Sequence, residues 1–243
     1  MEDHLLSAFE FKPLDMLAPP EVEAWKHSRL AAGAKAETVA KELRTLKAII
    51  HHAIARDAIS RDPLRTVRAP RNLDSKPHRF YEKGELIALY AAAYDKQAVW
   101  KLLANTGLRR AEAQALRWKD VGKESIHVLS TEVERTKSMK WRDVPLSAGA
   151  LEALDRLKGQ GPLVLPQITP PSLSRSFVKD ASRAGLDGSL HTLRHTYISH
   201  LVRLGVPLRT VQIYAGHSHY ATTEKYVYLS PGAHVREVTE LDV

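Results

Sequence analysis

The chain of 243 residues contains no cysteine. Disulfides, thiolate nucleophiles and cysteine-based zinc sites are therefore excluded. The longest apolar run, "LIALYAAAY" at 86–94, is too short to span a bilayer. The first residues, "MEDHLLSAFEF", begin acidic and lack the apolar core of a signal peptide. We expect a soluble protein of the cytoplasm, without a membrane partner.

Motifs that hold nucleotide phosphates are missing as well. The sequence has no G-x-x-x-x-G-K-[ST], no G-x-G-x-x-G and no G-x-S-x-G nucleophile elbow. "HTLRH" at 191–195 spaces two histidines as zinc sites do. However, Thr192 stands where H-E-x-x-H has its glutamate, and a third ligand is not evident. We expect no metal site.

The charge is strongly basic and unevenly distributed. The formal net charge is +8, which favours a polyanionic partner such as nucleic acid. Residues 56–79 carry seven Lys/Arg against three Asp/Glu, and three prolines interrupt the stretch. Proline blocks helix continuation, so this stretch is predicted to be extended. We expect a helical domain at 1–70, a basic linker at 71–79 and a second domain at 80–243.

Helical periodicity dominates the first part of the chain. Apolar residues in 37–59 recur at intervals of three and four: Val39, Leu43, Leu46, Ile50 and Ile54. Thr38 is the expected N-cap of this helix. Pro19 and Pro20 are expected to open an earlier helix that Gly33 ends.

The second part is predicted to be mainly α-helical with a small antiparallel β-sheet. A helix is expected over 82–107, ending at Gly107, and a short one over 110–118. Residues 125–145 alternate in polarity around "KSMK", which predicts a hairpin. Further helices are expected at 147–158, 172–184, 192–204, 207–214 and 232–241.

Four stretches contain residues suited to phosphate chemistry. In "NTGLRRAEAQALRWKDV" (105–121), Glu112 could hold the Arg109 guanidinium or cap the next helix. In "TKSMKWRDVPL" (136–146), Lys137 could reach into a cleft. In "HTLRH", His191 and Arg194 share one side of a helix start, where an oxyanion could bind. Taken singly, each also fits a plain role: a helix turn, an exposed hairpin or a cap.

The fourth stretch, "AGHSHYATTEKYVYL" (215–229), holds three tyrosines. Tyr220, Tyr226 and Tyr228 could all pack in the core, or one could be a nucleophile. Local pattern does not decide between them.

The order of these motifs is more specific than any one of them. T-G-L-R, then Lys137 before "RDVPL", then "HTLRH", "AGHS" and "ATTEKY" resembles the tyrosine recombinases, the phage integrase family. Residues 37–63 also resemble the helix of that family's core-binding domain. The resemblance implies a helical core-binding domain followed by a mixed α/β catalytic domain. Ala215 departs from the family, where leucine often precedes Gly-His.

The resemblance implies a complete catalytic set and no metal or other cofactor. Tyr226 would be the nucleophile, since it follows His217 by nine residues and ends T-T-x-x-Y. Lys137 would be the general acid, and His191 would accept the phenol proton or position the phosphate. His217 would donate a hydrogen bond to the phosphate or support the tyrosine. The implied catalytic residues are Arg109, Lys137, His191, Arg194, His217 and Tyr226.

By the same resemblance, the protein would be a site-specific DNA recombinase that works through a 3′-phosphotyrosyl intermediate. A type IB topoisomerase-like activity and a non-catalytic DNA-binding relic are the alternatives. The expected partners are double-stranded DNA at the nucleoid, three further copies in a homotetramer on paired sites, and accessory DNA-bending proteins. The candidate DNA contacts are Arg44, Lys47, Arg71, Lys140, Arg142, Arg175 and Lys179. For each of these, a solvated surface charge fits equally well.

Overall fold

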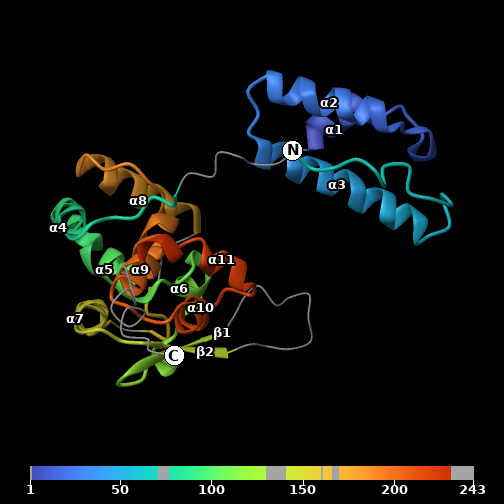
Figure 1. The fold of residues 1–243 in the computed structure, drawn as a ribbon. Coiled ribbons are helices and arrows are strands. Elements are labelled where there is room, and N and C mark those ends of the chain that lie inside the picture. Colours follow the sequence, from blue (N-terminus) through green and yellow to red (C-terminus); the bar gives the residue numbers. More distant parts are fainter. Residues whose placement is uncertain (1, 71–76, 130–140, 160, 166–169, 231–243) are drawn as a thin grey trace, which may run out of the picture. The chain divides into compact units, whose positions relative to one another are not determined.

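The computed structural model describes residues 2–70, 77–129, 141–159, 161–165 and 170–230 (Figure 1). The chain divides into two compact units, residues 1–76 and 77–243. Within the described ranges, no helix has both the length and the apolar character needed to cross a membrane.

Unit 1 is a small helical unit. It contains α1 (Glu2–Phe9), a 3-10 turn (Leu14–Met16), α2 (Pro19–Ala31) and α3 (Ala36–Ile54). The apolar stripe expected on α3 is buried at Val39, Leu43, Leu46 and Ile50. These side chains form one core with α1, α2 and the segment after α3, through Leu5, Val22, Trp25, Leu64 and Val67.

Two features of unit 1 differ from the sequence prediction. The N-cap of α3 is Lys35, and not Thr38, which lies inside the first turn. Helix α1 was not predicted, because its eight residues are too few to display a clear period.

Unit 2 is mostly helical and contains a two-stranded sheet, as predicted. Its helices before the sheet are α4 (Lys83–Ala92), α5 (Gln97–Thr106) and α6 (Arg110–Ala115). Strands β1 (Ser125–Leu129) and β2 (Trp141–Pro145) pair antiparallel, with Ile126 opposite Val144. The helices after the sheet are α7 (Ala148–Leu157), α8 (Pro170–Arg183), α9 (Leu190–Arg203), α10 (Leu208–Ala215) and α11 (Tyr220–Glu224).

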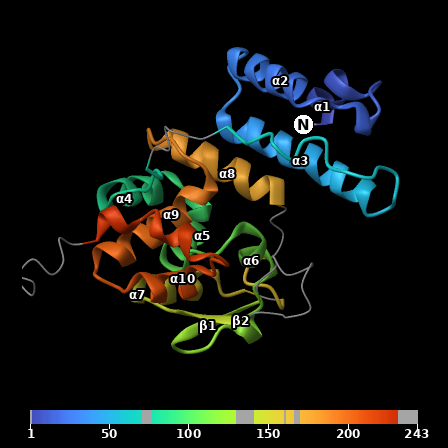
Figure 2. The same ribbon diagram turned by 45° about the vertical axis from the view of Figure 1, so that its right-hand side comes forward.

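Helix α9 lies at the centre of unit 2. It packs against α5, α8 and α10, and α5 packs in turn against α7 (Figures 1 and 2). Its inward residues Leu193, Ile198 and Val202 are buried in one large apolar core that also contains Trp100 and Phe177. Because α9 is covered on several sides, its first turns are held rigidly against the turns that follow α5 and α10.

The predicted single helix over 82–107 is wrong. The structure has two helices, α4 and α5, separated by a 3-10 turn at Tyr94–Lys96. Tyr94 adopts a φ of 38°, which an α-helix does not accommodate. The Arg183 guanidinium lies 4.7 Å from the centre of the Tyr94 ring. The sequence around the break, "AAAYDKQAVW" at 91–100, contains neither proline nor glycine, so the usual signals that end a helix are missing there.

Two other predicted elements fall partly or wholly outside what is described. The "KSMK" turn and the helix predicted at 232–241 lie outside the described residues. The short helix predicted at 110–118 ends earlier, at Ala115, and a 3-10 turn follows at Trp118–Asp120.

Candidate active site

The turn after α5 places the first arginine of the site. Gly107 ends α5 with a left-handed φ of 60°. A Cβ atom there would lie 2.3 Å from Cδ1 of Tyr197, so both the conformation and the close packing require glycine. Arg109 follows as the N-cap of α6, and its backbone N–H donates to Oε2 of Glu112 at 2.7 Å. The turn therefore directs the Arg109 side chain toward α9 and α10.

Glu112 holds two guanidinium groups at once. Nη1 of Arg109 donates to its Oε1 at 2.9 Å. Nη1 and Nη2 of Arg142 donate to its two oxygens at 2.9 and 2.8 Å. Burial alone would raise the pKa of Glu112, but the hydrogen bonds and charge of Arg142, with help from Arg109, lower it to about 2. Both roles expected of Glu112, capping α6 and holding Arg109, are confirmed.

Arg142 lies in a different environment from the one predicted. It was expected to contact DNA, yet only 8% of its surface is exposed. Besides the two bonds to Glu112, its Nε donates to the carbonyl oxygen of Tyr214 at 2.9 Å. A DNA contact does not fit a buried guanidinium whose hydrogen bonds go to Glu112 and Tyr214. The signal was present in the sequence, because Arg142 and Val144 share the inward side of a strand with period two.

Arg194, on the first turns of α9, is almost fully buried at 2% exposure. Its Nη1 donates to the Gly107 carbonyl at 2.7 Å, and its Nη2 donates to the Ala215 carbonyl. Burial and the nearby charge of Arg109 lower the pKa of Arg194 to about 10, so the guanidinium is still charged at neutral pH. One side chain thus ties the turn after α5 to the turn after α10.

The turn after α10 joins both arginines to a histidine. Gly216 ends α10 with a φ of 66°, and its carbonyl accepts from Nη2 of Arg109 at 2.6 Å. Nδ1 of His217 lies 2.8 Å from the Thr223 hydroxyl. Burial, then the charges of Arg194 and Arg109, lower the pKa of His217 to about 3. His217 is therefore a neutral imidazole at neutral pH.

Of the three tyrosines in this region, Tyr226 is buried with 2% of its surface exposed. Tyr220 and Tyr228 are 41% and 51% exposed. The Tyr226 hydroxyl forms a hydrogen bond with Nδ1 of His195. Burial raises the pKa of Tyr226, while the charge of Arg194 partly offsets that rise.

Three histidine rings form a cluster next to this phenol. The ring of His191, exposed on the first turn of α9, meets the ring of His195 edge-on at 4.7 Å. The ring of His78 stacks on that of His195 at 4.3 Å and 8°, and lies 5.4 Å from the Tyr226 ring. Although His191 is exposed overall, the groups packed around its ring partly desolvate it, and this desolvation, then the charges of Arg194 and Arg109, lowers the pKa of His191.

The sequence reasoning missed His78 and His195. His195 follows His191 by four residues, so both lie on one face of α9, and this spacing indicates two neighbouring rings on a helix as well as a zinc site. Among the described residues, no group of three His, Asp or Glu side chains is placed to hold a metal ion.

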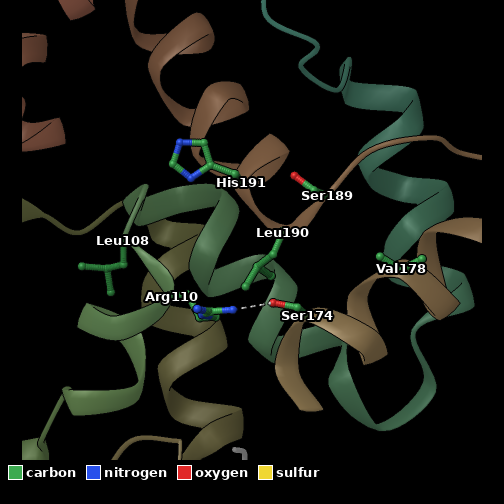
Figure 3. Close-up of a pocket in the computed structure, with 7 residues that line it drawn as sticks. All are labelled: Leu108, Arg110, Ser174, Val178, Ser189, Leu190 and His191. Atoms are coloured by element: carbon green, nitrogen blue, oxygen red, sulfur yellow. Dashed lines mark hydrogen bonds between the residues drawn. The ribbon is translucent and has the colours of Figure 1, made fainter. Parts of the chain in front are cut away.

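A hollow of about 330 Å³ opens beside His191 (Figure 3). It lies between the turn after α5, helix α8 and the start of α9. Nη1 of Arg110 donates to the Ser174 hydroxyl across it at 3.3 Å. The lining side chains are Leu108, Arg110, Ser174, Val178, Ser189, Leu190 and His191.

The remaining predicted residues are distributed over both units. Arg175 and Lys179 are exposed on α8, and Arg44 is exposed on α3. Lys47 is half-buried, and its Nζ donates to the Val67 carbonyl at 2.8 Å. The predicted residues Arg71, Lys137 and Lys140 lie outside the described residues.

Sequence comparison finds one matching family profile and curated relatives of the same kind. The sequence profile of the phage integrase family matches residues 82–232. Tyrosine recombinase XerC of Pediococcus pentosaceus is 28% identical over 222 residues, which cover 79% of this chain and 71% of that protein.

Solved structures show the same fold. The Tn1549 transposon integrase in complex with transposon right end DNA superposes with a TM-score of 0.78 at 19% identity, covering 98% of this chain and 91% of that one. The lambda integrase tetramer bound to a Holliday junction superposes with a TM-score of 0.68 at 18% identity, covering 89% and 69%.

Proposed function

The chain belongs to the phage integrase family, the tyrosine recombinases, and we propose that it cleaves and rejoins DNA at specific sites with Tyr226 as the nucleophile. One observation supports this assignment above the others. Tyr226 is buried, and its hydroxyl is hydrogen-bonded to His195 on the helix that carries Arg194, whereas Tyr220 and Tyr228 are largely exposed.

The two arginines act on the scissile phosphate. Arg109 and Arg194 bind its non-bridging oxygens and stabilise the added negative charge of the five-coordinate transition state. Their partners already hold them in place: Glu112 and the Gly216 carbonyl for Arg109, and the Gly107 and Ala215 carbonyls for Arg194. Because the cations are oriented before DNA arrives, little reorganisation is needed during the reaction.

The proton balance of cleavage involves the remaining members of the set. The Tyr226 oxygen bonds to phosphorus and gives its proton to His191. The bond from phosphorus to the 5′-oxygen breaks, and that oxygen takes a proton from Lys137. His217, neutral and hydrogen-bonded to Thr223, donates its N–H to a non-bridging oxygen. The product is a 3′-phosphotyrosine and a free 5′-hydroxyl. The 5′-hydroxyl of a second strand then attacks the phosphotyrosine, which rejoins the DNA and releases Tyr226.

DNA binding is assigned to both units. We assign residues 1–70 as the core-binding domain, 71–79 as a basic linker and 80–243 as the catalytic domain. Arg175 and Lys179 would contact backbone phosphates from α8. The hollow lined by Arg110 would receive the strand that flanks the scissile phosphate. On paired sites, four copies would exchange strands, in the service of a mobile element or of chromosome resolution, with accessory DNA-bending proteins.

The alternatives are less well supported. A type IB topoisomerase-like activity would relax supercoils with the same chemistry, but the relative and the solved structures named above are recombinases and integrases. A non-catalytic relic would have no need for both a buried Tyr226 and a pair of arginines already held by internal hydrogen bonds. Recombination between two paired sites on separate duplexes distinguishes the first alternative from our proposal.

Covalent trapping tests the proposal directly. The protein is incubated with nicked duplexes that carry candidate attachment sites, and protein–DNA adducts are resolved by denaturing electrophoresis. We expect adducts with the unaltered chain and with Tyr228→Phe, and none with Tyr226→Phe. Adducts that survive Tyr226→Phe but disappear in Tyr228→Phe would show that the nucleophile is wrongly assigned.

A further inference from the structure

The segment 78–82 is fastened along α9, turn by turn. The backbone N–H of Tyr81 donates to the Thr196 hydroxyl at 2.9 Å, and Nε2 of His200 donates to the Tyr81 carbonyl at 2.9 Å. The Arg203 guanidinium lies 4.6 Å from the centre of the Phe80 ring. We call residues 78–82 the strap. It begins one residue after the start of unit 2 at Pro77.

The strap sets the position of His78. Its ring lies flat against the ring of His195, with the centroids 4.3 Å apart and the planes only 8° from parallel. The edge of His191 meets His195 from another side. An imidazole stacked on one ring and abutted by a second has little freedom to rotate, so the direction of its Nδ1 is fixed.

That Nδ1 points at the proposed nucleophile. The hydrogen bond between Nδ1 of His195 and the Tyr226 hydroxyl is a direct contact with the atom that would attack phosphorus. Tyr226 itself sits between the five-residue helix α11 and a 3-10 turn at Val227–Leu229. Such short elements leave much of the phenol's position to side-chain contacts.

We propose that His195 is a positioning residue for the nucleophile, and that His78, carried by the strap, holds the His195 ring in the orientation that receives the phenol. This inference rests on the proposed role of Tyr226. Neither histidine belongs to the set implied by the family resemblance.

The protonation states of His195 and Tyr226 support a role for His195 in orienting the phenol and argue against His195 taking the proton. Burial, followed by the charges of His191 and His78, lowers the pKa of His195 to about 3. Burial raises the pKa of the phenol. A neutral acceptor facing a weakly acidic donor keeps the proton on the tyrosine. His195 therefore orients a neutral phenol, and the proton leaves to another group, His191, as the oxygen–phosphorus bond forms.

Single-turnover cleavage of a nicked duplex tests the inference. His195→Ala removes the acceptor, and we expect cleavage to slow by about 10- to 100-fold, because a small misplacement of a reacting atom has an effect of that size. His195→Asn keeps an acceptor oxygen near the place of Nδ1 and should stay within a few-fold of the unaltered rate. His78→Ala should slow cleavage by less than His195→Ala. His27→Ala, an exposed histidine of unit 1, is the matched control.

Two further readouts separate positioning from folding and from base catalysis. DNA affinity and the melting temperature should be unchanged in His195→Asn and His78→Ala. These two variants therefore still test the inference if His195→Ala does not fold. The acid limb of the pH–rate profile should keep its shape in every variant. A lost limb in His195→Ala would identify His195 as the base and overturn the inference.

The failure of this inference differs from the failure of the proposed function. If the unaltered chain forms no adduct with any site, the proposed function fails. If the unaltered chain forms adducts and His195→Ala forms them equally fast, His195 does not position the phenol. Equal loss of rate in His195→Asn and His195→Ala would likewise refute an acceptor role.

Discussion

At the scale of single residues, the arginine geometry depends on one buried carboxylate. Glu112 is fully covered and accepts hydrogen bonds from both Arg109 and Arg142. An isolated buried carboxylate is very unfavourable, but one paired with two guanidinium groups is stable and rigid. Arg142 thus contributes to the site by holding Glu112, which in turn holds Arg109.

Replacing Arg142 by Met should therefore destabilise the protein strongly. Glu112 would lose two of its hydrogen bonds while staying buried, and breaking a buried ion pair costs about 3–5 kcal/mol. The free energy of unfolding in urea measures the effect. Arg175→Met, at an exposed position, should change that free energy by less than about 0.5 kcal/mol. A loss below about 1 kcal/mol in Arg142→Met would contradict the role given to the pair.

Acid should destabilise the fold in two stages. The pKa values of His195 and His217 are lowered from 6.5 to about 3, so the unfolded chain binds protons that the fold does not. The contribution of these two histidines to the free energy of unfolding is therefore fully present above pH 6.5, and it is lost as the pH falls from there toward 3. Glu112, lowered from 4.5 to about 2, adds a loss that begins below pH 4.5.

Urea unfolding at several values between pH 7 and pH 4 measures this dependence. The double variant His195→Asn/His217→Asn should lose less stability than the unaltered chain between pH 6.5 and pH 4.5, because it lacks both titrating rings. An identical slope in the two proteins would show that these histidines do not carry the acid sensitivity.

At the scale of elements, the site is made of turns that follow helices. Gly107 ends α5 and Gly216 ends α10, both in left-handed conformation, and the start of α9 lies between them. The carbonyl groups of these turns accept hydrogen bonds from Arg109 and Arg194. Helix ends leave carbonyls without helical partners, so buried guanidinium groups satisfy them and are held by them.

Gly216→Ala should impair both stability and cleavage. Any side chain there adopts an unfavourable φ, at a cost of about 1–2 kcal/mol, and its Cβ would lie 2.7 Å from Nη1 of Arg142. Gly185→Ala is the matched control, since Gly185 has a similar φ of 70° and no atom within 4 Å of the added Cβ. We expect a larger loss in unfolding free energy for Gly216→Ala, and slower single-turnover cleavage in that variant alone. Equal losses would exclude the contact with Arg142 as the cause.

At the scale of the whole molecule, the excess of positive charge is concentrated in the second part of the chain. Residues 76–243 carry 24 Lys/Arg against 17 Asp/Glu, a net charge of +7, whereas residues 1–75 carry 12 against 11. Some of the cations in unit 2, such as Arg142 and Arg194, are buried and hydrogen-bonded to groups within the protein. Arg175 and Lys179 on α8 are exposed to solvent, so they are the better candidates for phosphate contacts.

DNA affinity should fall steeply with salt, and Arg175→Gln and Lys179→Gln should each reduce the slope of log Kd against log salt by about 1. Each variant should weaken binding to specific and random duplexes alike, because backbone contacts carry no sequence information. Fluorescence anisotropy at four salt concentrations measures both. Lys101→Gln, whose lysine pairs with Glu152, should leave the slope unchanged. Unaltered slopes in both α8 variants would remove that helix from the DNA interface.

The sequence by itself determined the family, the mostly helical fold with its small sheet, the buried stripe of α3 and the link between Arg109 and Glu112. These are local or ordered features: a helical period, a spacing of three residues and a series of motifs along the chain. The tertiary structure alone decided that the helix predicted over 82–107 breaks at Tyr94, that Arg142 finds Glu112 as its partner, and that His78 and His195 meet at Tyr226. His78 and Tyr226 are far apart in the sequence. Their contact depends on how the strap, α9 and the segment after α11 pack around one core, and no local period encodes that packing.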